Sequence, residues 1–247
     1  MVTLYSRSEI EQMKKPAAVV KEVFKRLEEY IKPGLTTKDV DIFVEKVINS
    51  LSALPSSKNY HGYPAACCTS VNEVVVHGIP GDRVLNDGDI ISVDVVVYKE
   101  GFHSDACRTF AVGNVGSDAQ RLMQVTKEAF FKGAEQAKVG NRLGDISAAI
   151  QEHVEKAGFG VVRDLFGHGV GRNMHEEPSV PNFGKANRGL RLKTGMVLAV
   201  EPMVTFGDYR VRTLRDGWTT VTVDNSISAH YENTIVITGG EPEILTL

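Results

Sequence analysis

The chain has 247 residues, of which 42% are hydrophobic and 24% are charged, with a formal net charge of −3. These values are ordinary for a globular protein with a sizeable core, and they argue against a dedicated nucleic-acid or anionic-membrane binder, which carries a basic excess. Three cysteines provide neither a disulfide framework nor paired zinc motifs. No signal-like or membrane-length apolar segment is present, so we expect a cytoplasmic protein.

Two helices are predicted in the first quarter of the chain. Ser8 and Glu11 form a capping-box pattern, and the apolar residues that follow recur every three or four positions as far as Ile31. Pro16 lies inside this segment and is expected to kink the first turns or to separate them from the rest. A second amphipathic helix is predicted to begin after Thr36.

Residues 88–111 predict a β-hairpin around which the rest of the chain is organised, because β-branched residues flank a Lys-Glu-Gly turn. A turn centred near Lys99 and Glu100 places Asp94 opposite or nearly opposite Asp105, with both carboxylates on one face. Like charges so close are destabilising unless a partner such as a metal ion neutralises them. A register slip of one residue would instead put the two carboxylates on different faces.

The second half predicts two more helices and then four short strands. Their expected ranges are 117–138, 144–157, 195–203, 209–214, 218–223 and 228–237. No linker or low-complexity segment marks a domain boundary, so we expect a single domain over residues 1–247. It is expected to have two lobes, at about residues 1–113 and 114–247.

An internal duplication relates the two halves. Residues 88–94, GDIISVD, match residues 195–201, GMVLAVE, at an offset of 107 residues, and the helical segments before them match at an offset of 106. We interpret this as a duplicated helix-helix-strand unit, because only two copies exist. Asp94 and Glu201 therefore occupy equivalent positions.

Four carboxylates and one histidine lie within or beside apolar strand patterns. These candidate metal ligands are Asp94, Asp105, His168, Glu201 and Glu232. Any one alone would more often be a surface residue at a strand end, but two of them are related by the duplication. The oxygen-rich set suits Mn²⁺, Fe²⁺ or Co²⁺ and could hold Zn²⁺. Four carboxylates carry too much charge for one divalent ion, so the set predicts two metals bridged by carboxylates and a water, which would also supply a hydroxide.

Other motifs are less specific. Residues 167–178, GHGVGRNMHEEP, resemble a phosphate-binding loop but lack its lysine, and prolines follow where a helix would begin. His175 is either a functional residue on this loop or a surface histidine, and His77 is either functional or a structural residue that ends a strand. The chain has no G-x-S-x-G and no H-E-x-x-H motif.

Five long stretches resemble the methionine aminopeptidases of the short type I bacterial kind, and the resemblance covers essentially the whole chain. They are YHGYPAACCTSVNEVVVHGIP, ISVDVVVYKEGFHSDACRTF, GHGVGRNMHEEP, VLAVEPMV and DGWTTVTVDNSISAHYENTIVIT. The resemblance implies an α+β pita-bread fold, in which a pseudo-two-fold, duplicated and curved antiparallel sheet is covered by helices. It also implies removal of the initiator methionine from nascent proteins and peptides whose second residue is small.

By the family pattern, the five candidate ligands bind two divalent ions, such as Co, Mn, Fe(II) or Zn, with Asp105 and Glu232 as bridges. A metal-bridging hydroxide would attack the carbonyl that follows the methionine, and Glu201 would be the proton shuttle. His77 would donate a hydrogen bond around the scissile amide, and His175 would stabilise the oxyanion.

The same pattern implies two further groups of residues. An apolar, adaptable pocket for the methionine side chain would be formed by Tyr60, Tyr63, Cys68, Met174 and Trp218, together with His77 and His175. A monovalent cation would be bound at Asn72, Val74 and Ser228.

Relatives that share the scaffold supply the alternatives. Aminopeptidase P, prolidase and creatinase usually add a large N-terminal domain, whereas the first predicted helix here begins near residue 8. A prolidase-like dipeptidase and a non-catalytic pita-bread binding protein remain the other interpretations. The expected partners are peptide and nascent-protein N-termini that start with methionine, with ribosome association left open. We expect a monomer that binds neither nucleic acid nor membrane.

Overall fold

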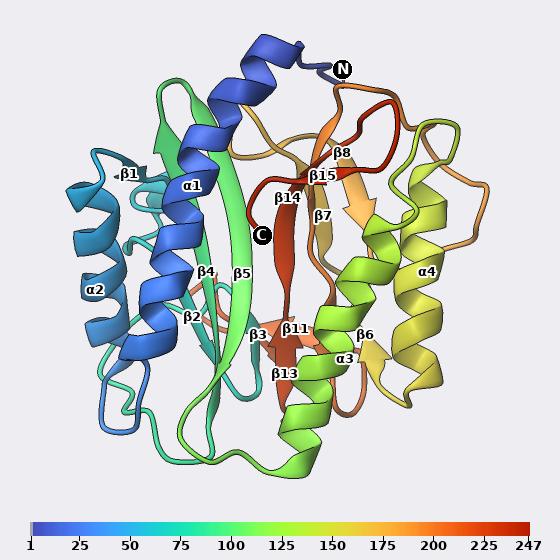
Figure 1. The fold of residues 1–247 in the computed structure, drawn as a ribbon. Coiled ribbons are helices and arrows are strands. Elements are labelled where there is room, and N and C mark those ends of the chain that lie inside the picture. Colours follow the sequence, from blue (N-terminus) through green and yellow to red (C-terminus); the bar gives the residue numbers. More distant parts are fainter. Residues whose placement is uncertain (1) are drawn as a thin grey trace.

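The computed structural model describes residues 2–247, which contain four α-helices and one short 3₁₀ helix (Figure 1). The helices are α1 (Arg7–Tyr30), α2 (Thr37–Ser50), η1 (Tyr60–Gly62), α3 (Ser117–Ala134) and α4 (Leu143–Lys156). None of the described helices combines the length and the apolar composition that a membrane crossing needs.

The strands of the described residues form one large antiparallel sheet and two small ones. They are β1 (Leu54–Pro55), β2 (Cys68–Val71), β3 (Val74–Val76), β4 (Ile90–Lys99), β5 (Phe102–Ala111), β6 (Gly160–Val161), β7 (Phe166–Gly169), β8 (Glu176–Pro181), β9 (Val197–Val200), β10 (Met203–Thr205), β11 (Val211–Thr213), β12 (Thr220–Thr222), β13 (Ser228–His230), β14 (Glu232–Val236) and β15 (Glu243–Ile244). The large sheet has the order β1-β4-β5-β14-β9-β7-β8, with β2 beside β4 and β15 beside β14. The small sheets are β13-β10-β6 and β11-β12-β3.

α1 begins earlier than the sequence pattern indicates. The expected capping box of Ser8 and Glu11 is wrong, because Ser6 and Glu9 form it instead. The helix is continuous from Arg7 to Tyr30 with Pro16 inside it, so the first turns are not separate. The buried stripe of α1 packs on the sheet, and this tertiary contact maintains the helix despite the proline.

The hairpin of β4 and β5 forms as expected, but its register differs from the prediction. Asp94 pairs with Cys107, and Asp105 pairs with Val96, because the turn is centred between Glu100 and Gly101. The two carboxylates are therefore diagonal neighbours and not directly opposed. Moving the turn centre by one residue shifts each pairing by two, so both side chains stay on the same face.

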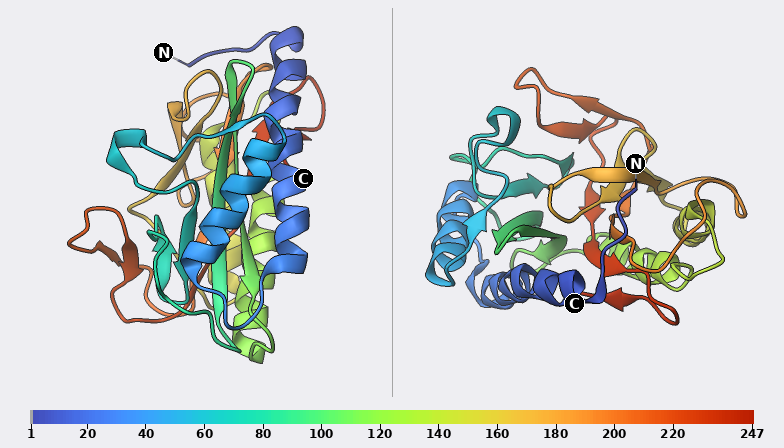
Figure 2. Two further views of the ribbon diagram at one scale, coloured as in Figure 1. Left: turned by 90° about the vertical axis from the view of Figure 1, so that its left-hand side faces the viewer. Right: turned by 90° about the horizontal axis from the view of Figure 1, so that it is seen from above.

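The large sheet has one apolar face and one functional face. Odd-numbered valine and isoleucine residues of β4, between positions 91 and 97, are buried in one cluster with apolar residues of α1 and α2. On the same strand, Asp94 and Val96 line a cavity. The four α-helices lie on one side of the curved sheet, and the segment that contains β11 and β12 lies on the other (Figure 2). The C-terminal end returns to the helical side, where Glu243 pairs with Lys14 of α1.

The duplication is visible in the order of the strands. β5 from the first half and β14 from the second half are neighbours at the middle of the sheet, with β4 and β9 outside them. α1 and α2 pack on the β4 side, whereas α3 and α4 belong to the cluster that includes β9 and β14 residues. Asp94 on β4 and Glu201 after β9 are thereby equivalent in space as well as in sequence.

Candidate metal centre

Strand register aligns a row of side chains across the functional face. Cys68 on β2 pairs with Asp94 on β4, Asp94 pairs with Cys107 on β5, and Cys107 pairs with Glu232 on β14. Paired residues of antiparallel strands point to the same side of the sheet. The row therefore directs Asp94 and Glu232 into one cavity, and Glu201 lines the same cavity from the end of β9.

A second row lies two residues further along the strands. Asp105 is on β5, and its backbone N–H donates to the Thr234 hydroxyl at 2.9 Å, while that hydroxyl donates to the Asp105 carbonyl at 2.8 Å. This exchange joins β5 to β14 at the point where the two halves of the chain meet. His168 on β7 pairs with Ala199 on β9, which places it beside Asp105.

The ring of His168 directs a free nitrogen towards the carboxylates. Its Nδ1 lies 2.9 Å from the carbonyl oxygen of Gly169, which can only accept, so Nδ1 carries the proton and Nε2 keeps its lone pair. Nε2 is 3.6 Å from an oxygen of Asp105 and 3.6 Å from an oxygen of Glu201. The structure thus brings all five sequence-predicted ligands to the wall of one cavity.

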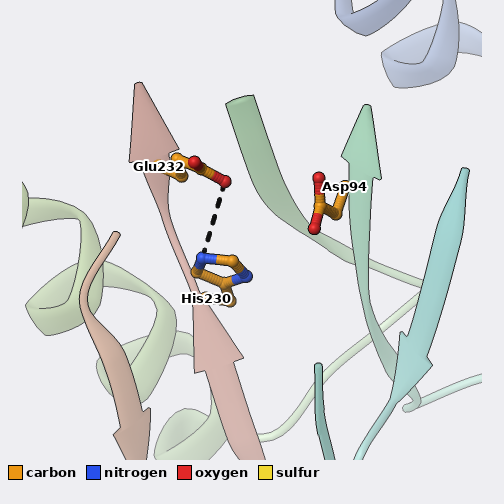
Figure 3. A group of neighbouring side chains, drawn as sticks. All are labelled: Asp94, His230 and Glu232. Atoms are coloured by element: carbon orange, nitrogen blue, oxygen red, sulfur yellow. Dashed lines mark ion pairs between the residues drawn. The ribbon is translucent and has the colours of Figure 1, made fainter. Parts of the chain in front are cut away.

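One member of the cluster was missed in the sequence. His230 ends β13, is 2% exposed, and has its Nε2 3.8 Å from Glu232 and 3.9 Å from Glu201. One oxygen of Asp94, one oxygen of Glu232 and a ring nitrogen of His230 lie within 4.8 Å of one another (Figure 3). The feature of the sequence that indicates His230 is its position two residues before Glu232, because residues two apart in an extended segment point to the same face.

Several buried polar atoms at this centre lack a hydrogen-bond partner. They are Asp94 Oδ1, Asp105 Oδ1, Glu232 Oε1 and His230 Nε2. Buried polar atoms without partners are costly, and ionised carboxylates have only acceptors to offer one another. Asp94, His230 and Glu232 form one group with the spacing of metal ligands, and Asp105, His168 and Glu232 form a second. The donor set therefore fits the hard or borderline divalent metals that carboxylate and imidazole ligands select.

Burial changes the proton affinity of each group. It raises the pKa of Asp94 to about 7, and burial together with the charges of Asp94 and Glu201 raises the pKa of Asp105 well above its usual range. The pKa values of Glu201 and Glu232 are raised for the same reasons. Burial lowers the pKa of His168 to about 3, so this imidazole is neutral at physiological pH.

Asp94→Asn should stabilise the metal-free protein by an amount that grows with pH. Burial raises the pKa of Asp94 from 3.8 to about 7, so the folded state holds a proton that the unfolded state has released. Between these pH values the folded state binds more protons, and its stability falls as pH rises. Asparagine does not titrate, so the difference in unfolding free energy should increase from pH 4 to about 7 and then level off.

Denaturant unfolding of both proteins in a chelating buffer measures this difference. The comparison with the variant is needed because burial lowers the pKa values of His168 and His230 to about 3, which contributes the opposite pH dependence. A difference that stays flat across this window would contradict the prediction.

The cluster of carboxylates and histidines forms part of the wall of a cavity of about 270 Å³. The five side chains expected to bind methionine lie on its wall, namely Tyr60, Tyr63, Cys68, Met174 and Trp218. Tyr63 and Trp218 meet edge to face, with ring centroids 5.1 Å apart, and the Tyr63 hydroxyl donates to the Gly78 carbonyl at 2.9 Å. These contacts give the cavity a rigid apolar wall next to the carboxylates.

His175 and His77, for which the sequence allowed either a functional or a structural role, both line this cavity. His175 Nδ1 lies 2.8 Å from the Tyr60 hydroxyl, and its ring centroid is 4.3 Å from that of His168. His77 meets the edge of Trp218, and burial lowers its pKa to about 4. Both imidazoles are available as neutral hydrogen-bond donors at physiological pH.

The residues expected at a monovalent cation site also lie together. The Ser228 hydroxyl is 3.1 Å from the carbonyl oxygen of Asn72 and 3.0 Å from that of Val74. The Asn72 side chain meanwhile donates to Asp89 at 2.8 Å. Two carbonyl oxygens and a hydroxyl therefore converge where β3 meets β13.

The sequence and the fold are similar to those of known metallopeptidases. Residues 11–239 match the model of metallopeptidase family M24. The chain is 53% identical over 247 residues to a methionine aminopeptidase of Clostridium perfringens, covering 100% of this chain and 99% of that protein. The crystal structure of methionine aminopeptidase from Rickettsia prowazekii superimposes with a TM-score of 0.99 at 41% identity, over 100% of both chains.

A prolidase from Pyrococcus furiosus shares the fold alone, with a TM-score of 0.81 at 21% identity over 99% of this chain and 65% of that one. These likenesses confirm the expected α+β pita-bread fold, a helix-covered antiparallel sheet with carboxylates and histidines on its other face. The chain belongs to the metallopeptidase family M24. Within that family, its full-length likeness is to methionine aminopeptidases.

Proposed function

We propose that this chain is a metal-dependent aminopeptidase that removes the N-terminal methionine from peptides and nascent proteins whose second residue is small. The observation that carries the proposal is the cluster of buried carboxylates and neutral histidines beside an apolar cavity of about 270 Å³. Full-length likeness to methionine aminopeptidases at 53% identity supports the choice of substrate.

Two divalent ions would be held at this centre, with Mn²⁺, Fe²⁺, Co²⁺ and Zn²⁺ as candidates. Their ligands would be Asp94, Asp105, His168, Glu201 and Glu232, with Asp105 and Glu232 shared between the ions. When bound, such ions polarise a carbonyl and bring the pKa of a water close to neutrality. A monovalent cation at Asn72, Val74 and Ser228 is a further proposal.

Glu201 is the proposed proton shuttle. Burial and the neighbouring charge of Asp94 raise the pKa of Glu201, which favours uptake of a proton by its carboxylate and subsequent release to the departing amine. Because Glu201 follows β9 directly, the rigid sheet fixes its backbone. The group is thus both positioned and tuned for transfer of a proton between attacking water and leaving group.

His175 and His77 are the proposed hydrogen-bond donors to the substrate. The Tyr60 hydroxyl is 2.8 Å from His175 Nδ1, and when it donates there, Nε2 keeps the proton. That proton is then available to an oxyanion that develops on the scissile carbonyl. His77 lines the same cavity and would donate to the scissile amide group.

Replacing His175 with alanine should lower kcat/KM by about 10²- to 10³-fold, as loss of one oxyanion donor does in other enzymes. Tyr60→Phe removes only the hydroxyl that orients the imidazole, so its effect should be smaller, about tenfold. Steady-state kinetics on a methionyl tripeptide measure both effects. Tyr209→Phe, at a partly exposed position outside the cavity lining, is the matched control, and the proposed role is wrong if Tyr60→Phe costs more than His175→Ala.

Hydrolysis of a peptide series tests the function itself. The metal-loaded protein should release methionine from Met-Ala-Ser and fail to cleave Xaa-Pro dipeptides, with activity falling as the second residue becomes larger. Preference for Xaa-Pro substrates would favour a prolidase-like dipeptidase. Metal binding without hydrolysis of either series would favour a non-catalytic binding protein.

The setting of this activity is also proposed. We infer a monomeric enzyme of one domain over residues 1–247, with lobes at about residues 1–113 and 114–247, that acts in the cytoplasm. Its partners would be protein N-termini that begin with methionine, met as nascent chains leave the ribosome. The net charge of −3 supports the absence of a dedicated nucleic-acid surface.

A further inference from the structure

His230 and Glu232 point to the same side of the sheet because one residue separates them. Tyr231 between them packs on the opposite side, with its ring 5.5 Å from Phe130 of α3 and the Arg108 guanidinium 4.3 Å above it. With Tyr231 fixed against the helices, strand alternation turns His230 towards the cluster of carboxylates. Figure 3 shows the imidazole below Glu232 and across from Asp94.

The spacing around His230 is that of metal ligands and not of hydrogen bonds. Its Nε2 is 3.8 Å from Glu232 Oε2 and 3.9 Å from Glu201 Oε2, beyond the range of a hydrogen bond. Two ligands that each lie about 2.0–2.2 Å from one ion are separated by roughly 3–4.4 Å. His168, with oxygens of Asp105 and Glu201 both 3.6 Å from its Nε2, shows the same spacing.

The burial of His230 also supports a role as a metal ligand. His230 is 2% exposed, and its Nε2 lacks a hydrogen-bond partner, as does Oδ1 of Asp94 nearby. One ligand atom from each of Asp94, His230 and Glu232 lies within 4.8 Å of the other two. A second trio, Asp105, His168 and Glu232, meets the same condition, and the two trios share only Glu232.

We propose that His230 is a direct ligand of the metal ion held at Asp94 and Glu232, so that each of the two ions is bound by one imidazole. This inference rests on the proposed dinuclear function. His230 serves the ion that Asp94 holds, and His168 serves the other ion. An added neutral nitrogen makes the Asp94 site less purely oxygen-based, which shifts its preference from Mn²⁺ towards Co²⁺, Fe²⁺ and Zn²⁺.

Cobalt titration of the metal-free protein tests the assignment. Calorimetry should give two Co²⁺ ions per wild-type chain, and His230→Ala should weaken one of them by at least about 100-fold while leaving the other within about twofold. Proton NMR of the Co²⁺-loaded protein should show two strongly shifted, exchangeable imidazole N–H signals in wild type. His230→Gln should show one, and it should not recover the lost affinity.

Two control comparisons distinguish direct metal binding by His230 from a structural role of this residue. His153→Gln alters a histidine that pairs with Glu128 on the helical side, so both affinities and both shifted signals should remain. One shifted signal in wild type, or full recovery of affinity by His230→Gln, would overturn direct ligation while leaving hydrolysis of Met-Ala-Ser intact. If the wild-type protein binds no Co²⁺ and cleaves no methionyl peptide, the proposed function fails as well.

Discussion

Asp105→Asn should reduce kcat/KM on Met-Ala-Ser by at least about 10³-fold, since several kcal/mol of charge stabilisation depend on the metal centre. Asp105 is 4% exposed and is the proposed bridge between the two ions. Asparagine keeps the shape of the side chain but removes its charge and replaces one ligand oxygen with an amide NH₂ group. The residue would then hold one ion weakly and could no longer join two.

The same substitution should make the metal-free protein more stable. Burial and the neighbouring carboxylates raise the pKa of Asp105, which means that its charged form is disfavoured in the folded state. Loss of activity with a gain in metal-free stability is a pattern that simple damage to the fold cannot produce. Denaturant unfolding in a chelator measures the stability, and Asp118→Asn on the surface of α3 is the control. An active Asp105→Asn protein would contradict the assigned role.

Removal of metal should abolish activity and lower the thermal unfolding midpoint by on the order of 10 °C. A ligand present at 100 times its Kd stabilises the folded state by about 2.7 kcal/mol per site, and two sites double this value. For a chain of this size, each kcal/mol corresponds to about 2–4 °C. The effect is large because the metal-free centre leaves several carboxylate oxygens buried without partners.

Chelation followed by addition of Mn²⁺, Co²⁺ or Zn²⁺ provides the measurement. Activity and midpoint should recover together, and the Asp105→Asn protein should recover much less of its midpoint than wild type. Calcium, which prefers more oxygen ligands in a larger and more flexible site, should restore neither property. Full activity after exhaustive removal of metal would refute the proposed chemistry.

Much of this site could be predicted because strand periodicity is a strong local signal. The apolar residues around Asp94 predict a strand, and its even-numbered residues share a face whatever the details of the turn. The turn centre lies one residue later than predicted, so Asp94 and Asp105 are nearly and not directly opposite, because register depends on the conformation of Glu100 and Gly101, both with positive φ. A shift of the turn centre by one residue changes each pairing by two residues and leaves every side chain on the same face of the sheet. The prediction that Asp94 and Asp105 share a face is therefore correct.

The errors arose where tertiary contacts decide between similar local patterns. Ser6 and Ser8 each have a glutamate three residues later, so sequence alone favours neither as the helix cap. The start is fixed by Tyr5, which is 6% exposed and whose backbone N–H donates to Gly195. His230 was missed for a related reason, because the packing of Tyr231 against α3 helps to turn the His230 side chain towards the carboxylates.

The junction between β5 and β14 has a consequence for how the protein matures. Asp94 and Asp105 come from the first half of the chain, whereas His168, Glu201, His230 and Glu232 come from the second. If the proposed pair of ions is bound, each ion takes ligands from both halves, and its full affinity requires that the two halves have docked. The proposed activity would then appear only after almost the whole chain has been synthesised and folded.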